Sequence, residues 1–156
     1  MMTETNTMKN LRLWLKECPA VNGTGRFNVD FMDSGPTSYA LYSSPTAVNY
    51  GTDVLGNVFI RPVQELNYIF QVLFPYSEDV SQNLKNLEFF SDVMNWIYLQ
   101  NSRKSFPIIE EGTVLSVMPT LSPYVYDGDG RSGRYQIQLK IKYRRRSDTE
   151  RSMING

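Results

Sequence analysis

The chain has 156 residues, 41% hydrophobic and 13% aromatic, which excludes a disordered protein and fits one globular domain. Its 16 basic and 16 acidic residues cancel at pH 7, so no overall charge attracts nucleic acid or anionic lipid. The sequence contains no histidine and one cysteine, Cys18, which excludes histidine-based catalytic triads, histidine zinc sites and internal disulfides. We therefore expect a protein of a reducing compartment, and we rank enzymes last.

No stretch of the sequence predicts export or membrane insertion. The first ten residues, MMTETNTMKN, lack a basic segment leading into an apolar one, so we expect no signal peptide. No apolar run approaches the roughly 18 residues that a membrane helix requires. We expect a soluble protein that is kept, or assembled, in a cytoplasm.

Residues 5–18 are expected to form the first helix. Thr5 or Asn6 can cap it, and Pro19 follows where it should end. One face would carry five apolar residues, which makes Trp14 a core residue and Cys18 an inert one: Met8, Leu11, Trp14, Leu15 and Cys18. The alternating leucines at 11–15 leave a strand as the alternative.

Two strands are expected next, paired as a hairpin. Residues 26–32 alternate apolar and polar side chains, which is typical of a half-buried strand. The second strand is SYALYS at 38–43, and the turn-rich DSGPT between the two favours antiparallel pairing.

Residues 44–62 fit no regular element well. Prolines and glycines interrupt the segment, yet it contains seven larger apolar residues: Val48, Tyr50, Val54, Leu55, Val58, Phe59 and Ile60. A long loop in a compact domain is usually functional or disordered, and this one is too apolar for simple disorder. We expect an arm or extended hairpin that buries its apolar side chains on a neighbouring molecule.

A central strand is expected at 64–74. One face carries Leu66, Tyr68, Phe70, Val72 and Phe74, and the other face is partly apolar as well. A helix then follows from Ser77 to Asn101, with Glu78 and Asp79 in its first turn, where the helix dipole favours acidic residues. Its apolar stripe is Val80, Leu84, Leu87, Phe90, Met94 and Ile97, with Trp96 beside it. One helix, or two with a break at 87–89, would fit.

The last two strands are expected at 114–121 and 134–144. The second alternates strictly, with Tyr135, Ile137, Leu139, Ile141 and Tyr143 on one face. The sequence thus predicts a single α+β domain over residues 1–146, with a mostly antiparallel, mixed sheet flanked by two to three helices. Residues 147–156 would be a flexible tail.

The loop before the last strand contains two motifs that suggest ligands. Its glycines at 128, 130 and 133 spell G-x-G-x-x-G, but they precede a strand, whereas a dinucleotide fingerprint must open a helix. Asp127 and Asp129 resemble the start of a calcium loop, but Arg131 and later positions lack the required ligands. We expect a hairpin tip with neither cofactor nor metal.

The only basic cluster lies at the end of the last strand. It consists of Lys140, Lys142, Arg144, Arg145 and Arg146, and the first three should share one sheet face. The cluster could meet DNA phosphates or an acidic partner, or it could be a solvated face that discourages aggregation. We favour the solvated face over DNA binding, with a protein–protein contact ranked between them.

Four stretches carry a family resemblance: MKNLRLWLKECPAV with NVDFM, LFPYSEDVSQNLKNLEFFSDVMNWIYLQN, VMPTLSPYVYD, and GRYQIQLKIKY. Together they resemble the small neck proteins of tailed bacteriophages that infect Gram-positive bacteria, the tail terminator or tail-completion proteins, often described as minor capsid proteins. The stretches cover most of residues 8–143 in the family's order. The most specific are RYQIQ and NWIYLQN, which is similar to the family's DWIEEQN-type helix ending. Residues 44–62 match least well.

The resemblance implies a structural protein without catalytic residues, on an α+β sheet flanked by helices. Such proteins form a ring, usually a hexamer, that caps the tail tube in the virion neck and presents a surface to the head–tail connector or head-completion protein. DNA would pass through the lumen without specific recognition, and no membrane would be involved. The candidate contacts are then Tyr50, Val54, Leu55, Val58 and Phe59 of the arm, Asp127, Asp129 and Arg131 of the tip, and the basic cluster.

Two alternatives stay open. The protein could be another head–tail connector or head-completion component, which would bind the portal side instead of the tube. It could also be a small nucleic-acid-binding module that uses the basic strand end.

Overall fold

The computed structural model describes residues 3–21, 26–29, 38–75, 80–126 and 132–146. These residues contain two helices, α1 (Thr3–Lys16) and α2 (Val80–Arg103). They also contain seven strands: β1 (Arg26–Val29), β2 (Ser38–Ser44), β3 (Tyr50–Thr52), β4 (Val58–Ile60), β5 (Val63–Pro75), β6 (Gly112–Tyr126) and β7 (Ser132–Arg145). The α+β fold expected from the sequence is confirmed. The tail at 147–156 lies outside the described residues.

Five strands form the main sheet, in the order β1-β2-β5-β7-β6. β5 lies between β2 and β7, which confirms the central strand predicted from its two apolar faces. The neighbours pair antiparallel, except that β1 and β2 run parallel, with Arg26 opposite Ser38 and Val29 opposite Leu41. The predicted β1–β2 hairpin is therefore wrong. An alternating pattern decides which side chains face the core, but it does not fix the direction of the strand.

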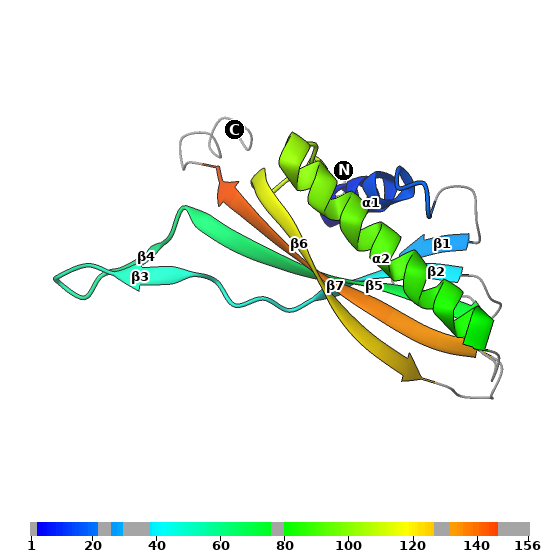
Figure 1. Ribbon diagram of the computed structural model, residues 1–156. Helices are drawn as coiled ribbons and strands as arrows, with labels where there is room; N and C mark the ends of the chain where they lie inside the picture. The colour runs from blue at the N-terminus through cyan, green and yellow to red at the C-terminus, as the bar shows by residue number, and fades with distance from the viewer. Residues whose placement is uncertain (1–2, 22–25, 30–37, 76–79, 127–131, 147–156) are drawn as a thin grey trace.

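Both helices cover the same face of this sheet (Figure 1). A single hydrophobic core lies between them and the sheet, with side chains from α1, α2 and the strands. Stacked rings mark its centre: Phe70 of β5 lies 5.4 Å from Phe27 and 5.9 Å from Tyr39, measured between ring centroids. Trp14 of α1 meets Trp96 of α2 at 4.8 Å. The opposite face of the sheet, called here the uncovered face, has no helix over it among the described elements.

The first helix buries the face that the sequence predicted, including Leu11, Trp14 and Cys18, and the strand alternative is excluded. It begins at Thr3, not after a cap at Thr5 or Asn6 as predicted. The segment TETNT offers several residues of capping type, so the sequence does not select one of them.

The second helix is continuous from Val80 to Arg103, so the alternative of two shorter helices is excluded. Phe90 and Ile97 are buried as predicted, but Leu87 is 46% exposed and Val93, absent from the predicted stripe, is fully buried. At about 100° per residue, Leu87 lies on the flank of the stripe that Phe90, Val93 and Ile97 form. The predicted cap and acidic first turn at 77–79 lie outside the described residues.

The last two strands form a long antiparallel pair in which Gly112 lies opposite Arg145 and Tyr126 opposite Arg134. Residues 127–131, with the candidate contacts Asp127, Asp129 and Arg131, lie outside the described residues. The residues that follow them, 132–145, form a strand and not a helix. The dinucleotide interpretation is thereby excluded, as the sequence predicted.

Candidate interaction surfaces

A two-stranded hairpin projects from one end of the main sheet (Figure 1). Its strands β3 and β4 pair antiparallel with each other, Tyr50 opposite Ile60 and Thr52 opposite Val58, and with no strand of the main sheet. We call residues 49–61 the hairpin arm. The extended hairpin that the sequence suggested at 44–62 is thus present, and its burial on a neighbouring molecule stays a prediction.

The hairpin arm and the segment that leads into it, residues 45–48, called here the approach, carry seven exposed apolar side chains: Val48, Tyr50, Val54, Leu55, Val58, Phe59 and Ile60. Those at the tip are the most exposed, with Val54 at 102% and Leu55 at 83% of full accessibility. All five arm residues proposed as contacts from the sequence are in this set. Single exposed apolar residues are normal, but seven of them between residues 48 and 60 indicate a candidate interaction surface.

The tip of the hairpin arm is held by its own hydrogen bonds. Oδ1 of Asp53 accepts from the backbone N–H groups of Leu55 and Asn57, each at 2.9 Å, and Oδ2 accepts from Nδ2 of Asn57 at 3.1 Å. Gly56 supplies the left-handed backbone of the turn with φ of 85°. The bonds from Asn57 lower the pKa of the Asp53 carboxyl, so this carboxylate is charged at neutral pH. The tip therefore presents two aliphatic side chains beside one negative charge.

The strands β3 and β4 of the hairpin arm are held together by contacts of the Arg61 side chain. Its guanidinium lies 5.6 Å from the centroid of the Phe59 ring, and its Nε donates to the carbonyl oxygen of Tyr50 at 3.3 Å. These two side chains cover Gly51, because a Cβ there would lie 2.7 Å from Arg61 Nη2 and 2.8 Å from Phe59 Cζ. A larger residue at this position would make the ends of these two side chains move away.

The base of the hairpin arm is clamped to the sheet by Gln64, a buried polar residue of β5. Its Oε1 accepts from the backbone N–H of Asn49 at 2.8 Å, and its Nε2 donates to the carbonyl oxygens of Asn49 at 2.6 Å and Arg61 at 2.8 Å. The side-chain amide thus imitates a strand partner for Asn49. The clamp fixes the direction in which the hairpin arm leaves the sheet.

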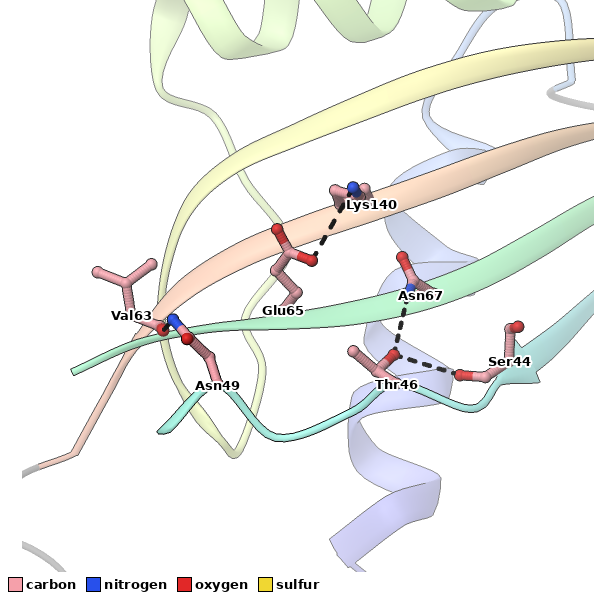
Figure 2. Close-up of polar contacts among 7 residues, drawn as sticks. All are labelled: Ser44, Thr46, Asn49, Val63, Glu65, Asn67 and Lys140. Atoms are coloured by element: carbon pink, nitrogen blue, oxygen red, sulfur yellow. Dashed lines mark hydrogen bonds and ion pairs between the residues drawn. The ribbon is translucent and has the colours of Figure 1, made fainter. Parts of the chain in front are cut away.

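Three further contacts fasten the approach to the hairpin arm (Figure 2). Nδ2 of Asn49 donates to the carbonyl oxygen of Val63 at 3.1 Å. Oγ1 of Thr46 accepts from Nδ2 of Asn67 at 2.9 Å and donates to the carbonyl oxygen of Ser44 at 3.4 Å. The chain between β2 and the hairpin arm therefore follows the sheet through specific polar contacts.

The predicted basic face exists on β7. Lys140, Lys142 and Arg144 lie on the uncovered face, where they pair in register with Asn67, Glu65 and Val63 of β5. Nζ of Lys140 lies 3.9 Å from Oε1 of Glu65 (Figure 2), with both side chains partly exposed. Such a pair is worth at most about 1 kcal/mol and lowers the local positive charge.

The other two basic candidates lie elsewhere. Arg145 alternates to the opposite side of β7, and its backbone N–H donates to the carbonyl oxygen of Pro62 at 2.8 Å, which ties β7 to the base of the hairpin arm. Arg146 follows the end of the strand. The structure therefore divides the five basic residues, and only three of them form one surface.

The hollows of the described structure include one on the uncovered face and one beside β6. One, of about 320 Å³ on the uncovered face, is lined mainly by polar groups such as Ser44, Asn67, Gln138 and Lys140. The other, the β6 recess, has about 530 Å³ between residues 104–109 and the start of β6. Its walls include Phe106, Ile108 and Leu115, and Ile108 is 79% exposed. This recess was not predicted from the sequence, although the apolar run FPII at 106–109 was a signal for it.

The edges of the main sheet are partly capped by helix side chains. Asn101 of α2 forms a two-way pair with Val117 on the edge strand β6: its Nδ2 donates to the carbonyl oxygen at 2.6 Å and its Oδ1 accepts from the N–H at 3.0 Å. On the other edge strand, Nε of Arg12 donates to the carbonyl oxygen of Phe27 at 2.8 Å. These caps occupy backbone groups that edge-to-edge pairing would need.

The described residues show no candidate metal site. They contain no group of three Asp, Glu or Cys side chains that would hold a metal ion. The Cys18 thiol is buried, and burial raises its pKa, which lowers its reactivity. Glu111 accepts a 2.8 Å hydrogen bond from Oγ1 of Thr7, so this acid serves the packing of α1. Neither described helix is long and apolar enough to cross a membrane.

The comparisons with known proteins add no functional name. No family model matches the chain, and no curated protein matches it. Among 21 matching chains of solved structures, one whose name states no function has 14% identity and a TM-score of 0.42. That match covers 94% of this chain and 98% of the other. A likeness at this level carries no argument about function.

Proposed function

We propose that the protein is a structural component of a tailed-bacteriophage neck, a tail terminator that closes into a ring and caps the tail tube. The observation that carries this proposal is the hairpin arm: an exposed apolar hairpin held in one direction by Gln64 and stiffened by Arg61. The phage setting rests on the sequence resemblance given above. A rigid, apolar projection supports an assembly role better than a catalytic one.

Burial of the hairpin arm on another subunit provides the driving force for assembly. Full burial of one aliphatic side chain stabilises by about 1.5–3 kcal/mol, so partial burial of several of the seven supports a specific contact. Because the clamp and the tip turn order the arm before contact, little conformational entropy is lost on binding.

The capped sheet edges favour a contact made by the arm over a contact made by strand pairing. An arm that leaves one side of a subunit and binds a different surface of the next subunit is a heterologous contact. Repetition of such a contact gives a closed ring when the rotation between subunits closes, and an open filament when it does not. A tail terminator is expected to form the closed ring and not the open filament.

The uncovered face is the surface we assign to the lumen side. It carries polar and basic side chains, and the ion pair of Lys140 with Glu65 moderates its positive charge. Weak, sequence-independent contact with passing DNA suits such a face. The ends of the ring would then meet the tail tube protein and the head–tail connector or head-completion protein, in the virion and during assembly in the host cytoplasm.

The test uses purified tail tubes and two forms of the protein, imaged by negative stain. In the variant, Gly-Gly replaces Tyr50–Ile60; the N–H of Arg61 already donates to the carbonyl oxygen of Asn49 at 3.0 Å, so the shortened loop closes easily. We expect the unaltered chain to form rings on one end of each tube and the variant to leave tubes bare while keeping its circular dichroism. Rings formed equally well by the variant would overturn the assembly role of the arm. Rings that bind portal assemblies but not tubes would identify a head-completion protein instead.

A nucleic-acid-binding role is the second candidate, favoured by the three cations that share the uncovered face. Charge reversal at Lys140, Lys142 and Arg144 tests it, with DNA affinity measured at two salt concentrations. Tight, salt-sensitive binding by a monomer that ignores tubes, lost on charge reversal, would favour this role over the terminator.

A further inference from the structure

We propose that the tip of the hairpin arm, Val54 and Leu55, inserts into the β6 recess of a second copy of this chain. This inference rests on the proposed self-association and names the surface that receives the arm. The arm is the donor, and the recess between residues 104–109 and the start of β6 is the acceptor.

The tip of the hairpin arm and the β6 recess are complementary in size and polarity. The recess holds about 530 Å³, within the roughly 300–1,000 Å³ of typical binding pockets, and apolar side chains such as Phe106, Ile108 and Leu115 line it. Ile108 and Leu115 are themselves exposed, at 79% and 43%. The two aliphatic side chains of the tip are the most exposed apolar groups of the described chain. Each surface therefore exposes apolar area that the other could cover.

The tip and the recess also carry opposite charges. Asp53 adjoins the two tip residues and is charged at neutral pH, because the tip hydrogen bonds stabilise its carboxylate. Lys104 is the one charged residue that lines the recess, so the negative charge of the tip would meet the positive charge of this lysine.

The backbone at Lys104 is unusual in a way that fits this role. Lys104 follows α2 with φ of 55°, in the left-handed conformation. Its N–H donates to the backbone carbonyl oxygen of Asn101, and the N–H of Ser105 donates to the backbone carbonyl oxygen of Gln100. Glycine is the residue preferred at such a helix end. A lysine there retains backbone strain that glycine would relieve, which is consistent with a function for its side chain.

The hairpin arm and the β6 recess lie at the same end of the main sheet. The hairpin arm precedes Val63 of β5, and the recess includes Gly112 of β6; both positions lie at the end of the sheet where β7 finishes, since Val63 pairs with Arg144 and Gly112 pairs with Arg145. Strand β7 separates them, and the arm points away from β6 in Figure 1. Donor and acceptor are therefore different surfaces at the same level of the subunit, as a lateral head-to-tail contact requires.

The main experiment mixes two chains that are each defective in one partner surface. One is the Gly-Gly replacement of residues 50–60, which keeps the recess; the other is Ile108→Asp, which keeps the arm. Ile108 is 79% exposed, so the substitution should leave the fold intact. Leu13→Asp is the matched control, because Leu13 is an exposed leucine on α1, outside both surfaces.

By sedimentation velocity, we expect each defective chain to be monomeric and their mixture to form a dimer of one arm and one recess. Leu13→Asp should assemble like the unaltered chain. If Ile108→Asp assembles normally while the arm variant does not, the recess is not the acceptor, and the proposed function stands. If the arm variant assembles normally without the second chain, the proposed function fails together with this inference.

Lys104→Gly tests the charge argument without risk to the fold. Its thermal midpoint should be unchanged or raised, because glycine adopts the left-handed conformation freely. For the mixing experiment, the substitution is placed on the chain that supplies the recess. The dissociation constant should then rise about two- to five-fold, as expected for the loss of one partly exposed ion pair. An unchanged dissociation constant, with the same salt dependence as the parent, would remove Lys104 from the contact.

Discussion

The side-chain amide of Gln64 and the backbone of Asn49 are joined by two hydrogen bonds that run in opposite directions. Asn49 donates through its N–H at 2.8 Å and accepts through its carbonyl oxygen at 2.6 Å. This arrangement lets one glutamine of β5 complete the pairing of a segment that has left the sheet. Gln64 is thus the buried side chain that links both ends of the hairpin arm to the sheet, beside the contacts of Thr46, Asn49 and Pro62.

Replacement of Gln64 by alanine should therefore loosen the hairpin arm and weaken assembly. The change leaves the N–H and carbonyl groups of Asn49 without this partner, at a cost of about 1–3 kcal/mol in the free energy of unfolding. Amide hydrogen exchange at Asn49 and Arg61 should accelerate, and the dissociation constant for self-association should rise. Gln138→Ala is the control, since Gln138 is an exposed glutamine of the uncovered face. Equal exchange rates in both variants would contradict the clamp.

Gly51→Ala should disturb the hairpin arm without destabilising the domain. The new Cβ would lie under 3.0 Å from the Arg61 guanidinium and the Phe59 ring, which must move apart. The loss of their cation–π contact amounts to about 0.5–1 kcal/mol, confined to the arm. We expect an unchanged thermal midpoint but faster hydrogen exchange at β3 and β4. Gly56→Asn, at a left-handed position with open space around it, is the matched change that should preserve slow exchange.

Asn101→Ala should expose the edge of β6. Its amide makes two bonds with Val117 and one, at 2.9 Å, with the carbonyl oxygen of Ile97. We expect a loss of about 1–2 kcal/mol in the free energy of unfolding and a new tendency to aggregate through strand pairing. Urea denaturation and light scattering at rising concentration would measure both. Asn95→Ala, at an exposed position of the same helix, should change neither; aggregation of that control would refute the edge explanation.

Stability should fall at high pH because of Tyr68. Burial, followed by the charge of Glu111 and by Tyr143, raises the pKa of Tyr68 from its ordinary value of 10.0 to about 12. Since the folded chain holds this proton more tightly than the unfolded chain, the stabilisation is complete below pH 10 and is lost as the pH rises toward 12. Urea denaturation from pH 9 to 12 should show a shallower decline for Tyr68→Phe than for the parent. Tyr50→Phe, an exposed control, should decline like the parent.

Patterns within one element were readable from the sequence. Alternation in β5 and β7 identified their buried faces, and helical spacing identified Leu11 and Trp14. The punctuated apolar segment at 44–62 likewise indicated a projecting hairpin. These features are local, because the period of the side chains is set by the backbone of the element itself.

Relationships between elements were not readable in the same way. Neither the parallel pairing of β1 with β2 nor the cap of Asn101 on Val117 leaves a periodic trace in the sequence. The clamp of Gln64 was hidden for the same reason, since a single glutamine in a strand has no pattern of its own. The β6 recess depends on how a loop lies beside the first residues of β6, which becomes visible only after the chain has folded.

The most direct test of the central claim is the solution mass of the unaltered chain and of the chain with Gly-Gly in place of Tyr50–Ile60. Light scattering over a hundred-fold range of concentration, with and without tail tubes, would give both masses. We predict a closed oligomer of about six subunits for the unaltered chain, the number implied by the family resemblance, and a monomer for the variant. A monomer at every concentration that ignores tubes, or the same oligomer from both chains, would contradict assembly through the hairpin arm.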